Sequence, residues 1–173
     1  MEKTLKEHTI SRIDILEGQS NLDLEGLDQL ILNLEWRKSF DLAADTSQCP
    51  DSPIVERIIY EILDSFYKTT GLKISLCKKW SHIQKKNMSV NLHNHYPDDI
   101  SSVFYVTAPY DSGDIVFYPN WFTHYRYIKG NTSSFKPEIG KYFIFPGTLD
   151  HAVTRNHSDE TRISLVFNFN LNE

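Results

Sequence analysis

The pattern of hydrophobic positions changes at about residue 71. Before it, apolar residues recur every three or four positions, which is typical of amphipathic helices. One helix is expected within Leu24–Trp36 and a second over Pro53–Thr70. For the second helix, Ser52 can cap the start and Gly71 can end it. Its broad apolar stripe predicts that one face packs against a sheet, so we expect residues 1–71 to form a helical N-terminal part.

From residue 72 the chain consists of short β-rich runs separated by turn residues. The expected strands are 73–84, 88–93, 101–108, 113–118, 141–145, 151–155 and 161–170. Many short strands at this spacing predict a mainly β sandwich or barrel, with the N-terminal helices packed on one sheet. We expect one domain over residues 1–173, with its β core at 72–173. The segment 119–139 is too long for a tight loop and rich in aromatic residues, which suggests that it covers a site.

Composition narrows the class of protein. The 173 residues carry a formal net charge of −5, which argues against a nucleic-acid partner because such a partner favours a basic surface. No apolar run approaches the roughly 18 residues that span a bilayer. The polar N-terminus does not resemble a secretory signal. The two cysteines provide no disulfide framework. These features predict a cytoplasmic protein without a membrane partner.

Two histidines, His93 and His95, are separated by one residue. Residues i and i+2 of a strand share a face, so both side chains can point to one spot. Imidazole is the commonest protein ligand for first-row transition metals, and the pair suggests a metal site. The alternative is that one or both simply form hydrogen bonds at the end of a strand.

A third histidine, His151, follows an apolar strand and the turn Pro146-Gly147. A mononuclear site needs a ligand from a different strand, because two neighbours on one strand cannot enclose an ion. His151 is placed to provide it. The alternative is a turn histidine that faces water.

The last predicted strand carries Arg162 and Ser164 on the face opposite to its apolar residues. If the apolar face packs against the helices, Arg162 points into the barrel, where an unpaired charge is costly. The planar fork of an arginine matches a carboxylate, and a serine hydroxyl can add to the same contact. An internal Arg/Ser pair near a metal therefore implies a bound dicarboxylate. An arginine on a solvated face is the alternative.

Together these motifs resemble the Fe(II)/2-oxoglutarate-dependent oxygenases. The distal histidine lies 56 residues after His95, and Arg162 follows eleven residues later. The similarity is greatest to the small 2OG-Fe(II) oxygenases of phages and bacteria, and it covers about residues 72–170. The matching positions are Trp80, His93, His95, Pro97, Ser101-Ser-Val-Phe-Tyr105, Phe145-Pro146, His151 and Arg162.

The resemblance implies a double-stranded β-helix, a jelly-roll or cupin-like barrel. It also implies that His93, His95 and His151 bind Fe(II), and that Arg162 and Ser164 hold the far carboxylate of 2-oxoglutarate. The expected reaction consumes O2 and hydroxylates an amino acid, a peptide or a small metabolite. One departure is that the usual triad has a carboxylate where His95 stands. Asp98 and Asp99 follow closely, but they are better interpreted as turn formers.

Two other functions are compatible with the same residues. A cupin uses a similar histidine pattern on the same barrel, and it could be a metal-dependent dioxygenase or isomerase without 2-oxoglutarate. An inward Arg162/Ser164 pair favours the oxygenase, because a cupin has no need of it. The third possibility is a binding domain that keeps the barrel but does no catalysis.

Overall fold

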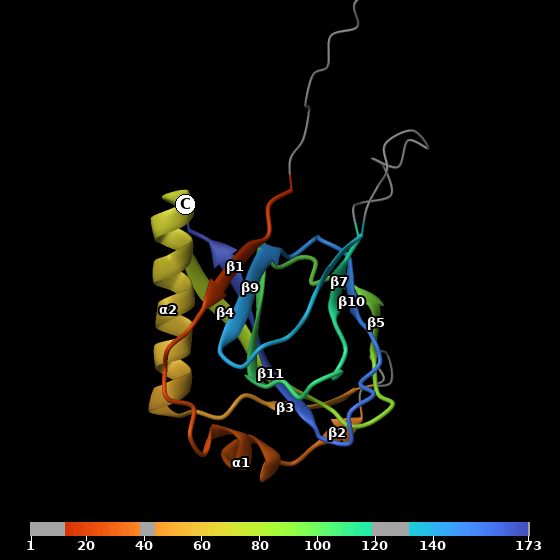
Figure 1. Ribbon diagram of the computed structural model, residues 1–173. Helices are drawn as coiled ribbons and strands as arrows, with labels where there is room; N and C mark the ends of the chain where they lie inside the picture. The colour runs from red at the N-terminus through yellow and green to blue at the C-terminus, as the bar shows by residue number, and fades with distance from the viewer. Residues whose placement is uncertain (1–12, 39–43, 119–131, 173) are drawn as a thin grey trace, which may run out of the picture.

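The computed structural model describes residues 13–38, 44–118 and 132–172 (Figure 1). They form two antiparallel sheets that face each other, with the long helix α2 on the outer side of the larger sheet. The helices are α1 (Leu27–Leu32) and α2 (Pro53–Thr70). The strands are β1 (Leu16–Gln19), β2 (Arg37–Lys38), β3 (Asp45–Gln48), β4 (Ile74–Gln84), β5 (Val90–His93), β6 (Ile100–Thr107), β7 (Ile115–Phe117), β8 (Ser133–Phe135), β9 (Lys141–Pro146), β10 (His151–Val153) and β11 (Arg162–Leu171).

Within each sheet, most neighbouring strands are distant from each other in the sequence. The larger sheet has the order β1-β9-β6-β11-β4-β3-β2, and the smaller has the order β5-β10-β7-β8. The last strand, β11, therefore lies in the centre of the larger sheet, between β6 and β4. Two facing sheets connected in this way form the double-stranded β-helix, which confirms the predicted fold class.

Helix α2 follows the signals in its sequence. The Ser52 hydroxyl accepts a hydrogen bond from the backbone N–H of Val55, and Pro53 begins the helix. Gly71 ends it with φ of 72° and donates its N–H to the Tyr67 carbonyl. No helix within the described residues is both long enough and apolar enough to span a membrane.

The outer core lies between α2 and the larger sheet. Ile163, Leu165 and Phe167 of β11 are fully buried there, together with Ile58 and Ile62 of α2. Because side chains alternate along a strand, this packing directs the even-numbered residues of β11 into the barrel. The predicted division of β11 into an apolar outer face and an inner face is confirmed.

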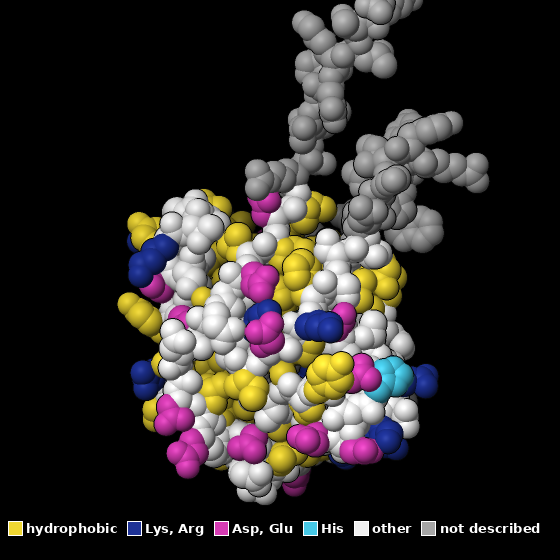
Figure 2. All heavy atoms as spheres, viewed as in Figure 1, with side chains coloured by type: hydrophobic (Ala, Val, Ile, Leu, Met, Phe, Trp, Pro, Cys, Tyr) yellow, Lys and Arg dark blue, Asp and Glu magenta, His cyan; other side chains and the backbone are white. Residues whose placement is uncertain are grey.

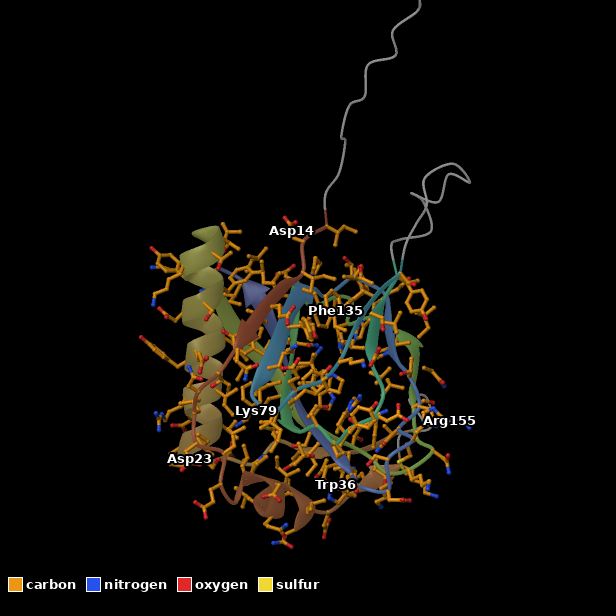
Figure 3. All side chains as sticks on the ribbon, viewed as in Figure 1. Asp14, Asp23, Trp36, Lys79, Phe135 and Arg155 are labelled. Carbon is orange, nitrogen blue, oxygen red and sulfur yellow. The ribbon has the colours of Figure 1, made fainter. Side chains whose placement is uncertain are left out.

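The inner core lies between the two sheets and is mainly aromatic. The rings of Phe117 and Phe145 lie 4.9 Å apart, and those of Phe135 and Phe143 lie 5.0 Å apart. Figure 3 places Phe135 inside the upper part of the barrel, between the two sheets. These rings fill one end of the barrel, and the polar residues of its inner face lie toward the other end.

The described surface carries charges of both signs. On the face shown in Figure 2, Asp and Glu side chains gather over the lower half, where α1 lies, and Lys and Arg side chains are interspersed. Two ion pairs at the surface, Lys86–Asp159 and Lys68–Asp64, have nitrogen–oxygen distances of 2.6 and 2.7 Å. This view therefore shows a mixed surface rather than one basic patch.

The N-terminal part differs from the prediction. The helix expected within Leu24–Trp36 covers only Leu27–Leu32, because Gly26 stands before it with φ of 76° and Asn33 ends it. Residues 13–71 are not only helical, since they also contribute β1, β2 and β3 to the larger sheet. In the predicted aromatic insertion, residues 119–131 lie outside the described residues, and β8 occupies Ser133–Phe135.

Candidate metal centre and cosubstrate site

The three predicted histidines meet beside the small sheet. His93 ends β5, His151 begins β10, and the two residues are directly paired across the sheet. His95 lies two residues beyond the end of β5, so a turn positions it rather than a strand. The expectation that His93 and His95 share a strand face is therefore wrong, but His95 reaches the same spot.

The spacing of the ring nitrogens suits one metal ion. One nitrogen from each of the three rings lies within 4.8 Å of the other two. Nε2 of His95 and Nε2 of His151 are 3.2 Å apart. Neighbouring ligand atoms at about 2.1 Å from a common ion are separated by roughly 3 Å, so this pair already has the required spacing.

Backbone carbonyls fix the orientation of two of these rings. Nδ1 of His93 lies 2.8 Å from the carbonyl of Asn91, and Nδ1 of His151 lies 2.9 Å from the carbonyl of Leu149. A carbonyl only accepts, so Nδ1 carries the proton in both rings and Nε2 keeps its lone pair. Metal-binding histidines typically have this arrangement.

The surroundings keep the three rings neutral. Burial is the largest cause that lowers the pKa of His93, lowers that of His95 to about 4, and holds that of His151 well below its ordinary value. The histidines also disfavour each other's protonation, since the charge on His93 lowers the pKa of both His95 and His151. At neutral pH each ring can therefore offer a lone pair without first losing a proton.

The turn that carries His95 is tied to the loop before β10. The backbone N–H of His95 donates to the Gly147 carbonyl at 2.7 Å, and the N–H of Gly147 donates to the Asp99 carbonyl at 2.8 Å. Within the turn, the N–H of Asp98 donates to the His95 carbonyl at 2.9 Å. These bonds fix the backbone of His95 relative to the strand that begins with His151.

Asp98 is a structural residue and does not replace the missing carboxylate ligand. Its carboxylate accepts hydrogen bonds from Lys78 Nζ at 2.8 Å and from Asn168 Nδ2 at 2.6 Å. The Asn168 Oδ1 in turn accepts one from the Ser101 hydroxyl. Burial alone would raise the pKa of Asp98, but these hydrogen bonds outweigh it and hold the pKa below its usual value. Asp99 accepts from the backbone of β11, so both aspartates serve the turn, as predicted.

Arg162 and Ser164 lie inside the barrel, in the same cavity as the three histidines. Arg162 is 2% exposed, and its Nη1 donates to the carbonyls of Ser112 and Gly113. Among the described residues, no carboxylate forms an ion pair with it. Its Nε has no hydrogen-bond partner there either. A buried cation with a free donor fits a carboxylate ligand, because its charge has no paired carboxylate among the described residues and its Nε–H has no acceptor there.

His82 is buried on β4 but does not belong to the histidine group. Its Nε2 accepts a hydrogen bond from the Trp80 indole at 2.8 Å, and burial lowers its pKa to about 3. The Trp80 ring also lies 5.5 Å from the His95 ring. This pair therefore forms the wall beside His95.

An open groove of about 930 Å³ leads to the histidines. One side is formed by β3 and the chain before it, including Arg37 and Gln48, and the other by Lys79 and Trp80 of β4. Figure 3 places the neighbouring Trp36 at the lower end of the barrel. The sequence did not indicate this wall, because the short polar strands β2 and β3 show no hydrophobic alternation.

Comparison with known proteins agrees with this geometry. The family model described as "Putative 2OG-Fe(II) oxygenase" matches residues 78–168, more than half of the chain. The chain therefore belongs to the 2OG-Fe(II) oxygenase family, whose cofactors are Fe(II) and 2-oxoglutarate. No curated protein sequence matches it.

Several solved structures share the fold. The epimerase SnoN, in complex with Fe3+, alpha ketoglutarate and nogalamycin RO, has a TM-score of 0.73 and 14% identity, covering 91% of this chain and 79% of its own. HygX from Streptomyces hygroscopicus, with nickel, 2-oxoglutarate and hygromycin B bound, has a TM-score of 0.71 and 11% identity. The match covers 90% of this chain and 82% of HygX. A prolyl-4-hydroxylase from Pseudomonas putida has a TM-score of 0.65 and 13% identity, and the match covers 90% of this chain and 92% of the hydroxylase. At these identities the similarity concerns the fold.

Proposed function

We propose that this enzyme binds Fe(II) through His93, His95 and His151 and anchors 2-oxoglutarate through Arg162 and Ser164. It then hydroxylates a substrate that lies in the adjoining groove. The observation that carries this proposal is that the histidine group and the buried, carboxylate-free arginine line one cavity. A cupin that does not use 2-oxoglutarate would have no use for this arginine, and the family match separates the chain from that alternative.

Each part of the site has a distinct task. When bound, Fe(II) and 2-oxoglutarate supply the oxidising chemistry, in which O2 is consumed and 2-oxoglutarate becomes succinate and carbon dioxide. The carbonyls of Asn91 and Leu149 hold two imidazoles so that Nε2 faces the metal position. Arg162 fixes the far end of the cosubstrate by charge and hydrogen bonding. Phe145, which contacts the His151 ring, helps to exclude water from this space.

The groove favours a polar substrate of moderate size. Its volume of about 930 Å³ exceeds what the cosubstrate needs and lies in the range of small-molecule sites. Its walls carry the charged residues Glu35, Arg37 and Lys79, and Trp80 offers an aromatic surface. We infer an amino acid, a short peptide or a polar metabolite. The inference of a small-molecule substrate is supported by SnoN and HygX, which share the fold and whose structures contain nogalamycin RO and hygromycin B. The net charge of −5 makes nucleic acid an unfavourable partner.

We also infer one domain and a cytoplasmic location. The single-domain organisation is supported by β1 and β3, which pair with β9 and β4 and so join the N-terminal part to the larger sheet. Both cysteines, Cys49 and Cys77, are free thiols, which fits a reducing compartment.

The test is turnover of 2-oxoglutarate to succinate, measured with Fe(II) and O2 against panels of amino acids, short peptides and polar metabolites. We expect succinate formation that requires Fe(II) and increases with one of these substrate classes. It should disappear in His151→Ala and persist in His157→Ala, because the His157 side chain is exposed and outside the site. If Fe(II) binds and no panel or condition gives succinate, the chain is a binding domain on this fold.

A further inference from the structure

One row of side chains runs from the open groove into the cavity of the histidine group. Arg37 of β2 lies directly opposite Thr46 of β3, and Thr46 lies opposite His82 of β4. Residues paired across a sheet point to the same face, so the three side chains share the inner face. All three line the groove, and His82 also lines the cavity that contains the histidine group. Arg37 therefore stands at the outer end of a path to the metal position.

The two ends of this row are far enough apart for one small molecule. Neighbouring strands lie about 4.8 Å apart, so the backbones of Arg37 and His82 are separated by about 10 Å. The groove along this wall has a volume of about 930 Å³. A molecule that contacts Arg37 at one end can therefore place its other end beside the metal position.

Among the described residues that line the groove, Arg37 is a cation without an ion-pair partner. Its side chain is exposed, and no carboxylate of the described residues pairs with it. The charge of Lys79, by contrast, is paired with Asp51. Glu35 lines the same groove, but it too forms no ion pair with Arg37. The guanidinium of Arg37 is therefore available to a ligand.

The surroundings of Arg37 fit a single negative charge. The planar fork of an arginine matches the two oxygens of a carboxylate. On β3, Thr46 offers a hydroxyl and Gln48 offers an amide to the groove, and both groups can donate hydrogen bonds. A phosphate would bring a second negative charge beside Glu35 without a second free cation to balance it. A carboxylate is therefore the better match.

Trp80 offers a surface for the uncharged part of such a molecule. It lies opposite Gln48, so the indole borders the same path. Its N–H donates to Nε2 of His82 at 2.8 Å, which leaves the face of the ring for an apolar contact. The ring lies 5.5 Å from that of His95, so a group that rests on it is close to the metal position.

We propose that Arg37 is a specificity-determining residue that binds a carboxylate of the substrate, and that the enzyme oxidises carboxylic acids whose uncharged part lies on Trp80. This inference rests on the proposed function and narrows its substrate class to anionic molecules. No sequence pattern indicated Arg37, because β2 has only two residues and joins the sheet through β3.

Lys38 provides a matched control for Arg37. It is the next residue of β2 and lies opposite Asp45, which in turn lies opposite Ile83 of the core beneath α2. Side chains alternate along a strand, so Lys38 points away from the groove. Lys38→Gln therefore removes the same charge from the same strand without touching the proposed site. Arg37→Lys keeps the charge but loses the planar fork, so it should retain only part of the carboxylate binding.

The experiment uses a panel of N-acetylated amino acids, each as the free acid and as the carboxamide, which differ by one negative charge. Protein loaded with Mn(II) and 2-oxoglutarate is kept without oxygen, so that no turnover occurs and the Arg162 site is filled. Bound probes are detected by the paramagnetic relaxation that Mn(II) causes in their protons. This signal also requires that the probe lies near the metal.

We expect the wild type to bind at least one acid about 5- to 10-fold more tightly than its amide. This preference lies between that of an exposed ion pair and that of a buried hydrogen bond to a charged group. Arg37→Gln should abolish the preference, and Lys38→Gln should keep it. The affinity for 2-oxoglutarate and the urea midpoint of Arg37→Gln should not change, because Arg37 lies outside the Arg162 cavity and has no ion pair to lose.

Several outcomes would overturn the proposal. Equal binding of acids and amides to the wild type would do so, and so would the absence of any bound acid. If the preference persists in Arg37→Gln, or falls equally in Lys38→Gln, Arg37 does not recognise the carboxylate. In each of these cases the proposed function stands as long as the Mn(II)-loaded wild type binds 2-oxoglutarate. If it does not bind 2-oxoglutarate, the proposed function fails and this inference fails with it.

Discussion

Gly147 should be essential to the metal centre although it offers no ligand. A Cβ atom at this position would lie 2.0 Å from the Asp98 carbonyl oxygen, where ordinary contact begins at 3.4 Å. In Gly147→Ala the turn that carries His95 must therefore move by about 1.4 Å. The obstacle is backbone on both sides, so no side-chain rotation relieves it. The shift would strain the bond from the His95 N–H to the Gly147 carbonyl.

The magnitude follows from the two effects of this displacement. Disturbing the support of a metal ligand typically costs 10- to 100-fold in metal affinity, and overpacking costs about 1–3 kcal/mol in stability. We expect Gly147→Ala to weaken Fe(II) binding about 10- to 100-fold, measured without oxygen by competition with a coloured chelator.

The control is Gly26→Ala. A Cβ atom at Gly26 would meet no atom within 4 Å, so the substitution affects only the backbone, whose φ is +76°. It should lose about 1 kcal/mol of stability and keep its iron affinity. Unchanged Fe(II) affinity in Gly147→Ala would refute the reasoning.

Three further predictions concern the groups around the site. Arg162→Lys keeps the charge but loses the planar fork, so calorimetry should show 2-oxoglutarate binding about 10- to 100-fold weaker with Fe(II) affinity unchanged. The pKa of Asp98 is depressed in the folded state, so the stability it provides is present above the ordinary value near 4 and lost as the pH falls through the folded value. Asp98→Asn should lower the free energy of unfolding in urea by about 1–2 kcal/mol at pH 7, with a difference from wild type that shrinks in acid. The pKa of His82 falls from 6.5 to about 3 on folding, so the unfolded chain binds a proton first and stability declines from pH 6.5 downward. His82→Gln, which keeps an acceptor for Trp80, should make that decline shallower in the same titration.

The sequence predicted the parts of the fold that have a regular hydrophobic period. The apolar stripe of α2 and the alternation of β11 each indicate one buried face. Together they predicted that Arg162 points into the barrel, where the structure places it. The histidine pattern predicted the residues of the metal centre, because His93 and His151 are positioned by neighbouring strands of one sheet.

The missed features depend on pairing with distant strands. Strand β3, with the sequence Asp-Thr-Ser-Gln, has no apolar period and forms because β4 offers a free edge. The position of His95 depends on a hydrogen bond from its backbone N–H to the carbonyl of Gly147, fifty-two residues away, which no local pattern reveals.

The most direct test of the central claim is the visible spectrum of the protein without oxygen, with Fe(II) and 2-oxoglutarate added separately and then together. The account predicts a weak charge-transfer band only when both are present, because 2-oxoglutarate then binds the iron held by the three histidines. The band should be absent in His151→Ala and retained in His157→Ala. Fe(II) binding without any band upon addition of 2-oxoglutarate would contradict the account.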